Sequence, residues 1–289
     1  MYVPAALEEI EKRYLRDLWR TAVSDAVVEQ RIDLASFGPV QAAIVAEEPE
    51  EPLLNVVLGA ALPGAVEDGH LGDAVEWVES HGVDYRVPVT PGRPASELAE
   101  RWLMERGHEQ GQSWIKFARE TSPPGFEEPP QIEVFELDYE PDACETISYL
   151  QDGSFLGDWW PGTFLFDLGL RGDWRRYVAY DEEDRSAGAV MLIQDGLAEL
   201  GPVACTKEDG GDVGERQTAL LRRCILDAAA AGCGAIFAEA EAPESGERFS
   251  TSAENLLLAG FKQAFVRPDW RPPRSHVEEA LKRRTWWVS

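Results

Sequence analysis

Two glutamates lie in segments with the residue pattern of strands, and their carboxylates could act as general bases. Alternation with period two places Glu199 on the same strand face as Leu197 and Val203. It places Glu239, late in its own strand, on the same face as Phe237. A carboxylate in such a position can take a proton from a protonated amine, directly or through water. A glutamate that only faces solvent would show the same pattern, so both interpretations stay open.

The other chemistry-bearing residues lack the spacing of a known site. No G-x-S-x-G sequence is present, so the nucleophile pattern of many hydrolases is missing. The four histidines show no metal-binding spacing, so we expect no metal site: His70, His81, His108 and His276. The four cysteines are scattered, and we interpret them as reduced thiols of a cytoplasmic protein: Cys144, Cys205, Cys224 and Cys233.

Charge narrows the classes of partner. The 289 residues carry a formal net charge of -26, with an isoelectric point near 4.5. Such a field repels phosphate backbones and anionic lipids, so we expect neither nucleic acid nor a membrane as partner. It favours cationic ligands such as amines, although a merely solvated acidic surface would give the same charge. No run of eighteen apolar residues and no signal peptide is present, which also favours the cytoplasm.

The first part of the chain, before a Pro-rich break, contains both helices and strands. Hydrophobic periodicity there predicts helices over 5–20, 23–32, 71–80 and 96–106, and strands over 40–46, 53–61, 83–89 and 113–118. The segment T-S-P-P-G-F-E-E-P-P at 121–130 excludes helix and central strand, so we place a domain boundary there and a first domain at 1–122.

The second part repeats this mixture in the order β-α-β-β-β-α-β-α-β. We expect strands over 132–138, 174–180, 187–194, 198–206, 235–240 and 261–266, and helices over 143–151, 217–231 and 251–259. This order predicts a mixed sheet with helices packed on it, in an α/β or α+β fold. A second domain would span 131–272, and a helical tail 273–289.

Four segments of the second part resemble, in order, the motifs of one enzyme family. They are L-A-E-L-G-P-V-A-C-T at 197–206, the helix 217–232, A-I-F-A-E-A-E-A at 235–242, and S-A-E-N-L-L-L-A-G-F at 252–261. The last is similar to S-x-R-N-L-x-R-A-G-F, with Glu254 and Leu258 in place of the two arginines. Residues 131–271 thus resemble a domain of the GNAT superfamily of acyl-CoA-dependent N-acyltransferases.

The first part resembles the degenerate N-terminal domain of tandem GNAT proteins. The matching words are L-N-V-V-L-G at 54–59, D-Y-R-V-P-V at 84–89, L-A-E-R-W-L-M-E-R-G at 98–107 and W-I-K-F-A-R at 114–119. The resemblance implies two GNAT-like domains, each with a mixed, mostly antiparallel sheet flanked by helices.

The resemblance also implies a binding site for acetyl-CoA, or another acyl-CoA, as co-substrate. Backbone groups of Val203 and Ala204 would line the pantetheine, and Asn255 would contact the cofactor or only pack locally. The family's pyrophosphate loop, R/Q-x-x-G-x-G/A, falls here on Asp212, Glu215 and Gln217, so two carboxylates would face a pyrophosphate. A rearranged set of backbone amides and one cation could replace it, and its members would be Gly210, Gly211, Gly214, Arg216, Gln217 and Thr218.

The family's acceptor loop corresponds here to Asp158, Trp159 and Trp160, which would suit an amine, although paired tryptophans commonly pack in cores. The general-acid tyrosine common in the family's last helix is replaced by Leu256. The resemblance implies an N-acetyltransferase that acts on a small-molecule or peptide amine, with Glu239 and Glu199 as candidate bases. The alternative is a non-catalytic GNAT-like protein that binds a ligand or partner. A homodimer is a further expectation.

Overall fold

The computed structural model describes residues 4–20, 31–125, 132–137, 171–180, 186–205, 213–243 and 246–274. The first elements in chain order are α1 (Pro4–Arg20), β1 (Ile32–Phe37), β2 (Val40–Val45), β3 (Val56–Leu58), α3 (His70–Ser80), β4 (Val87–Pro88), α4 (Ser96–Glu105) and β5 (Glu109–Glu120). They are followed by β6 (Glu133–Glu136), β7 (Trp174–Tyr180), β8 (Ser186–Gln194), β9 (Leu197–Cys205), α7 (Val213–Ala230), β10 (Ala235–Glu241), α8 (Thr251–Leu258) and β11 (Lys262–Arg271).

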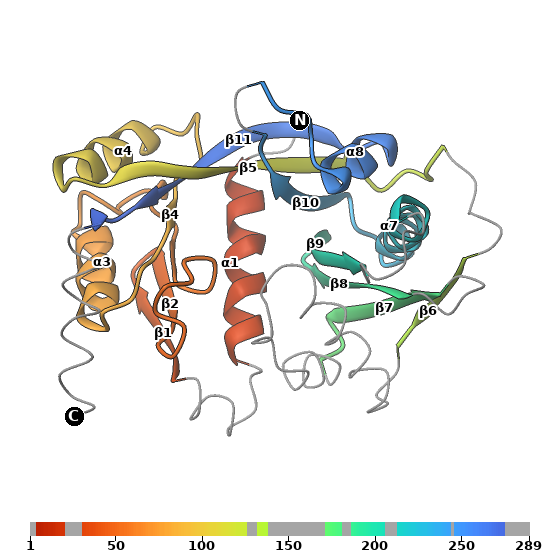
Figure 1. The fold of residues 1–289 in the computed structure, drawn as a ribbon, viewed down its shortest axis with the longest axis horizontal. Helices are drawn as coiled ribbons and strands as arrows, with labels where there is room; N and C mark the ends of the chain where they lie inside the picture. The colour runs from red at the N-terminus through yellow and green to blue at the C-terminus, as the bar shows by residue number, and fades with distance from the viewer. Residues whose placement is uncertain are drawn as a thin grey trace. The chain divides into compact units, whose positions relative to one another are not determined.

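Two compact units make up the described chain. Unit 1 contains the residues up to Trp114 together with those from Phe265 onward, and unit 2 contains Ile115–Ala264. Strands β5 and β11 (Figure 1) therefore each contribute residues to both units. The domain ranges expected from the sequence, 1–122, 131–272 and 273–289, stay predictions; the spatial division lies within strands and not in the Pro-rich segment.

Unit 2 is an α+β structure with a mixed, mostly antiparallel sheet. Its hydrogen-bonded strand order is β11-β5-β10-β9-β8-β7-β6. Strands β6 to β9 pair antiparallel with their neighbours, whereas β9 and β10 pair parallel. Helix α7 packs on β8 and β9 (Figure 1). In the sequence it lies between β9 and β10. The predicted hairpin at 174–194, the strand at 235–240 and the helix at 251–259 are confirmed, within two residues at each end.

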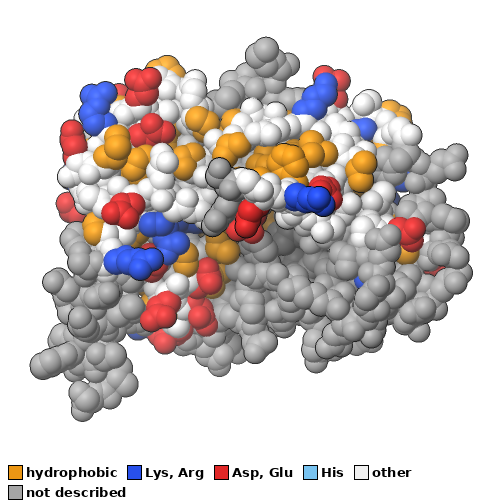
Figure 2. Space-filling view, turned by 45° about the horizontal axis from the view of Figure 1, so that its top comes forward, with side chains coloured by type: hydrophobic (Ala, Val, Ile, Leu, Met, Phe, Trp, Pro, Cys, Tyr) orange, Lys and Arg blue, Asp and Glu red, His pale blue; other side chains and the backbone are white. Residues whose placement is uncertain are grey.

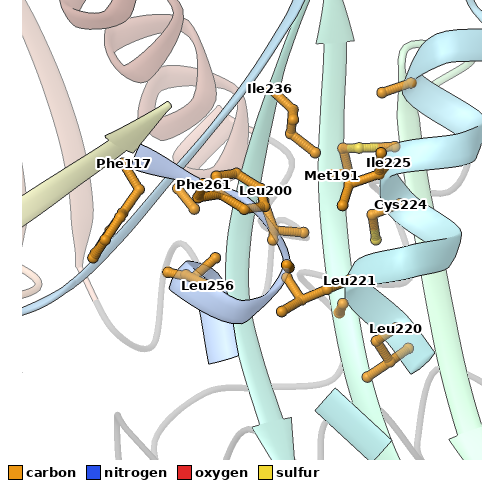
Figure 3. Close-up of a cluster of buried hydrophobic side chains, with 14 of the residues drawn as sticks. Phe117, Met191, Leu200, Leu220, Leu221, Cys224, Ile225, Ile236, Leu256 and Phe261 are labelled. Carbon is orange, nitrogen blue, oxygen red and sulfur yellow. The ribbon is translucent and has the colours of Figure 1, made fainter. Parts of the chain in front are cut away.

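The core of unit 2 lies between α7, α8 and one face of this sheet. Residues of α7 spaced four apart, such as Leu220 and Cys224 or Leu221 and Ile225, share one helix face, which is buried. Figure 3 shows Cys224 and Ile225 beside Met191 of β8. The same cluster also contains Phe117, Leu200, Ile236, Leu256 and Phe261. This packing holds α7 against the strands that lead into the candidate site.

The end of α7 depends on a glycine. Gly232 has a φ of 80°, in the left-handed region, and its N–H donates to the carbonyl of Ala229. The next N–H, of Cys233, donates to the carbonyl of Ala228, which completes a Schellman motif. Helix α7 therefore stops where the sequence predicts, and the chain turns directly into β10.

Gly232→Ala should lower the free energy of unfolding by about 1 kcal/mol, because a Cβ is strained at positive φ. Gly234→Ala is a matched control, since its φ is not positive and no atom lies within 4 Å of an added Cβ. Denaturant unfolding of both variants measures the difference. Equal values for the two substitutions would show that the backbone conformation at Gly232 does not carry the effect.

Unit 1 contains a sheet of its own with the order β1-β2-β3, which is antiparallel throughout. The sequence did not predict β1, because residues up to Ile32 fit a helical pattern. The two-domain resemblance implies one sheet for the first domain, 1–122, and this is wrong for β4 and β5, which do not belong to the β1-β2-β3 sheet. Strand β11 lies between them in the strand order, with Trp270 opposite Val87. This pairing joins segments about 180 residues apart, which local patterns do not reveal.

Helix α1 buries charged side chains within unit 1. Glu11 accepts two hydrogen bonds from Arg267 at 2.5 and 2.6 Å, and Glu8 accepts one from Arg93 at 2.7 Å. Burial raises the pKa of Glu8 above its ordinary value, although the positive charge of Arg93 acts in the opposite direction. The buried charges thus fix α1 to segments that are distant in sequence.

None of the described helices has the length and apolar character needed to cross a membrane. On the face seen in Figure 2, exposed hydrophobic side chains lie among Asp, Glu, Lys and Arg side chains.

Candidate functional site

The parallel pairing of β9 and β10 is short. It comprises three residue pairs, Ala235 with Leu197, Ile236 with Ala198 and Phe237 with Glu199. Both strands continue beyond this point, β9 to Cys205 and β10 to Glu241. Beyond Glu199, the described residues of β9 pair with β8 only, as Val203 does with Ala189. The two strands therefore part after their first three rungs.

A β-bulge in β9 lies directly after this divergence. Leu200 pairs with Met191 and Val203 with Ala189, so two residues of β9, Gly201 and Pro202, stand opposite the single Val190. The extra residue reverses the alternation of faces along the strand. Val203 consequently packs against the same hydrophobic core as Leu200. The prediction that Val203 shares the face of Glu199 is wrong, because strict period-two counting ignores the bulge.

The other face of the sheet carries the candidate bases. Glu199 lies opposite Phe237 in the ladder, and Glu239 follows two residues later on β10, so all three share one face. On β5, the strand next to β10, Ile115 and Phe117 belong to the core. Alternation then places Lys116, which lies between them, on the face of the two glutamates. The shared face predicted for Phe237 and Glu239 agrees with this arrangement.

Lys116 joins the two glutamates into one cluster. Its Nζ lies 2.7 Å from Oε2 of Glu239 and 4.0 Å from Oε1 of Glu199. The side chains of Lys116 and Glu199 are 1% and 5% exposed, whereas that of Glu239 is 31% exposed. A purely solvent-facing role is therefore wrong for Glu199. The cluster can bind a cation, and its more exposed carboxylate can exchange a proton with an incoming group.

Lys116 is not among the site residues predicted from the sequence. The signal was a single lysine in the word W-I-K-F-A-R, where apolar residues stand on both sides of it in a predicted strand. A long cationic side chain in such a strand is seldom buried without a partner of opposite charge. The partners lie on strands that are 83 and 123 residues further along, and only the strand order brings them together.

Helix α7 begins earlier than predicted, at Val213 and not at 217. Gly214 and Arg216 therefore lie in the first turns of the helix and not in a preceding loop. Arg216 and Gln217 are buried, whereas Glu215 is exposed and Thr218 is partly buried. An acidic residue in the first turn favours a helix start at this point. The other predicted loop residues, Gly210, Gly211 and Asp212, lie outside the described residues.

Asn255 binds a neighbouring helix. Its Nδ2 donates to Oε1 of Gln217 at 2.6 Å, so α8 is tied to the first turns of α7. Ser250 caps α8 by accepting a hydrogen bond from the N–H of Ala253. Asn255 thus has a packing role, and a contact with cofactor stays a prediction. The predicted acceptor residues Asp158, Trp159 and Trp160 lie outside the described residues.

The buried thiol of α7 does not take part in this site. Burial raises the pKa of Cys224 well above its ordinary value, so the thiol stays protonated and packs as a small apolar side chain. Among the described residues, no group of three or more His, Cys, Asp or Glu side chains could hold a metal ion.

Comparison with known proteins reveals the fold family. No protein-family model and no curated protein matches the sequence. Among solved structures, a GCN5-related N-acetyltransferase from Kribbella flavida matches with a TM-score of 0.57 and 13% identity, over 88% of this chain and 93% of that one. The fold is that of the GCN5-related N-acetyltransferases. The GNAT resemblance found in the sequence is thereby confirmed at the level of the fold.

Two further GNAT structures match over most of the chain. A GCN5-related N-acetyltransferase from Sphaerobacter thermophilus has a TM-score of 0.56 and 15% identity, covering 81% of this chain and 76% of that one. A tandem GNAT protein from the clavulanic acid biosynthesis pathway has a TM-score of 0.53 and 12% identity, covering 80% and 77%. At these identities the likeness concerns the GNAT fold, and the activity has to be argued from the site.

Proposed function

We propose that this protein is an N-acetyltransferase that transfers an acyl group, in the first place acetyl, from acyl-CoA to an amine. The observation that carries the proposal is the parting of β9 and β10 after three rungs, with Glu199 on the last rung and Glu239 just beyond it. A parted strand offers backbone N–H and C=O groups to the amides of a pantetheine chain. The carboxylates then lie where a proton has to leave the acceptor.

The residues of β9 suit the binding of an acyl-CoA, whereas those in the first turn of α7 suit it less well. Beyond Glu199, the edge of β9 that faces β10, including Val203 and Ala204, has no ladder partner on β10. The N-terminal turn of α7 would receive the pyrophosphate through its N–H groups and the helix dipole, with Arg216 nearby. The exposed carboxylate of Glu215 in that turn opposes an anion. Acyl-CoA would supply the activated thioester.

The proposed transfer requires a base. An alkyl amine resembles lysine, whose ordinary pKa is about 10.4, and therefore arrives protonated at neutral pH. Glu239, or the more buried Glu199, accepts this proton directly or through water. The amine nitrogen then attacks the thioester carbonyl, the C–S bond breaks with CoA thiolate as leaving group, and the nitrogen loses its second proton to water to give the neutral amide. Leu256 replaces the family's tyrosine, so water or another group protonates the thiolate.

Unit 1 supports the proposal of a second, degenerate GNAT-like domain. Here Val56 of β3 forms a parallel bridge with Arg86, the residue before β4, and the two bridge residues lie on either side of α3 in sequence. This is the same strand-helix-strand order as β9-α7-β10. The segment before α3, at 59–69, contains no Lys or Arg and includes Glu67 and Asp68. We therefore assign cofactor binding to unit 2 alone.

Two observations favour a non-catalytic GNAT-like protein as the second candidate. Glu239 is already in contact with an ammonium, that of Lys116, and Glu215 places negative charge where the family holds a pyrophosphate. The two candidates differ in their products. An acetyltransferase binds acetyl-CoA and releases CoA when an amine is added, whereas a binding protein releases none.

Acetyl-CoA is expected to bind one site per chain in a calorimetric titration, and CoA release is expected with a primary amine. Glu215→Gln should tighten this binding about two- to fivefold, because it removes a negative charge worth about 0.3–1 kcal/mol from the first turn of α7. Glu97→Gln, an exposed glutamate in the first turn of α4, is the matched control.

The outcomes of this titration and of the CoA-release measurement distinguish the two candidate functions. Binding without CoA release across a panel of primary amines would favour the non-catalytic protein. No binding at millimolar acetyl-CoA would contradict the acetyltransferase proposal. Equal tightening by Glu215→Gln and Glu97→Gln would show that the start of α7 does not hold the pyrophosphate.

A further inference from the structure

Helix α3 of unit 1 has an outward face that combines acidic and aromatic side chains. Asp73, Glu76, Trp77 and Ser80 are spaced three or four residues apart, so they share this face, which we call the α3 face. Three of them are exposed, and Trp77 is partly exposed. The buried residues of the helix lie on its other side, and they are Leu71, Ala74, Val75 and Val78. Within the described part of the chain, neither carboxylate of the α3 face has an ion-pair partner.

The indole of Trp77 is held by two aromatic neighbours. Its centroid lies 6.4 Å from the ring of Phe37 on β1 and 4.6 Å from the ring of His81. Nδ1 of His81 lies 2.8 Å from the carbonyl oxygen of Trp77, which fixes the imidazole beside the indole. An indole attracts ammonium and guanidinium groups, and carboxylates beside it strengthen that attraction. The α3 face therefore suits a segment that carries both cations and aromatic rings.

The sequence contains one segment of this kind. Residues 282–287 read K-R-R-T-W-W, with the only three consecutive basic residues of the chain followed by two tryptophans. Residues 32–85, which include β1 and α3, have the opposite charge, with eleven Asp and Glu and no Lys or Arg. Opposite charges of this size attract across a partly exposed surface, most strongly at low ionic strength.

The described chain leads toward the α3 face. Cγ of Pro273 lies 3.2 Å from the place that a Cβ on Gly107, just after α4, would occupy. Trp102 of α4 in turn lies 3.6 Å from the corresponding place on Gly72 of α3. The rise from Trp102 to Gly107 is about 8 Å and a helix is about 10 Å wide. Residues 274–282 can span up to about 30 Å, so the basic segment can reach the α3 face of its own chain.

We propose that the α3 face is a docking surface for residues 282–287 of the same chain. The three cations of this segment pair with Asp73 and Glu76, and its two indoles pack beside Trp77. The docked segment brings positive charge to the part of the sequence that lacks Lys and Arg. The inference concerns unit 1 and is independent of the proposed function.

Trypsin digestion of the full chain tests the docking, because trypsin cuts after Lys and Arg and a docked segment is protected until it opens. Mass spectrometry follows cleavage within 282–284 relative to cleavage after the exposed Arg248 in the same sample. Asp73→Asn/Glu76→Gln should raise this relative rate about three- to tenfold, because it removes two attractive charges from a partly exposed surface. Glu241→Gln/Glu254→Gln removes two exposed carboxylates of unit 2 and should leave the rate within about twofold of wild type.

A charge exchange distinguishes docking from a general effect on α3. Asp73→Lys/Glu76→Lys reverses the α3 face, and Lys282→Glu/Arg283→Glu reverses the segment while Arg284 stays as the cleavage site. Each reversal alone puts like charges together. The combination pairs opposite charges again, so cleavage after Arg284 should be at least about fivefold slower than independent effects of the two reversals would give.

Three results would overturn the proposal: no change in Asp73→Asn/Glu76→Gln, an equal rise in the control variant, or no restored protection in the combined reversal. Protection that disappears on dilution from about 100 to about 1 μM would mean that the segment docks on a second copy, and would overturn docking within one chain. Protection that is independent of concentration is the expected result.

Discussion

Glu239→Gln is expected to lower turnover by ~100-fold or more, the usual effect of losing a general base, with little change in acetyl-CoA affinity. Glu239 ranks before Glu199 because its side chain is 31% exposed, against 5%, and can meet an incoming amine. The amide of glutamine keeps the shape of the side chain but cannot take up a proton. Steady-state kinetics between about pH 6 and pH 9, together with calorimetry for acetyl-CoA, measures both quantities.

Glu241→Gln is the matched control, since Glu241 is an exposed glutamate on the same strand and face. Full turnover of Glu239→Gln over that pH range would show that Glu239 is not the base. The turnover of Glu199→Gln would then decide whether any glutamate of the cluster acts as the general base. Because both glutamates contact Lys116, the double variant Glu199→Gln/Glu239→Gln should lose less turnover than the product of the two single effects, since residues in one network do not behave additively.

The second large effect concerns stability. Arg267→Met should lower the free energy of unfolding by about 3–5 kcal/mol, because it leaves a buried carboxylate without its main counter-charge. Arg267 and Glu11 form two hydrogen bonds, and their side chains are 1% and 5% exposed. The pair joins β11 to α1 within unit 1. Denaturant unfolding followed by circular dichroism measures the change.

An exposed pair provides the comparison. Arg31 and Glu47 lie 3.4 Å apart with side chains 61% and 44% exposed, so Arg31→Met should cost less than about 1 kcal/mol. The double variant Glu11→Met/Arg267→Met should be more stable than Arg267→Met alone, since no charge is then left buried by itself. If Arg267→Met costs no more than Arg31→Met, the pair does not hold α1 in place.

Much of the unit 2 fold could be predicted from local patterns. The β7–β8 hairpin, α8 and the glycine end of α7 follow from alternation, capping and backbone preference, which act within a few neighbouring residues. The order of these elements, together with the four segments that resemble GNAT motifs, suggested the GNAT fold. It also placed Glu199 and Glu239 on adjacent strands.

The register of β9 and the position of β11 in the sheet depend on pairing with strands that are distant in sequence. The bulge at Gly201 and Pro202 turns Val203 toward the core, and its cause is the pairing with β8 and not any signal in β9 alone. Likewise, β11 lies between β4 and β5 in the strand order. The strand that ends the second expected domain in the sequence therefore contributes residues to unit 1. Local periodicity cannot report which distant strand supplies the hydrogen-bonding partner.

The sequence by itself therefore determined most elements of unit 2, their order and the two candidate carboxylates. Only the tertiary structure decided that Lys116 lies between those carboxylates, that Glu199 is buried and that Asn255 binds Gln217. The physical reason is that element formation depends on interactions between near neighbours, which the pattern of residues expresses directly. The charge and burial of a site depend on side chains that come from separate strands, and these meet only when the sheet has assembled.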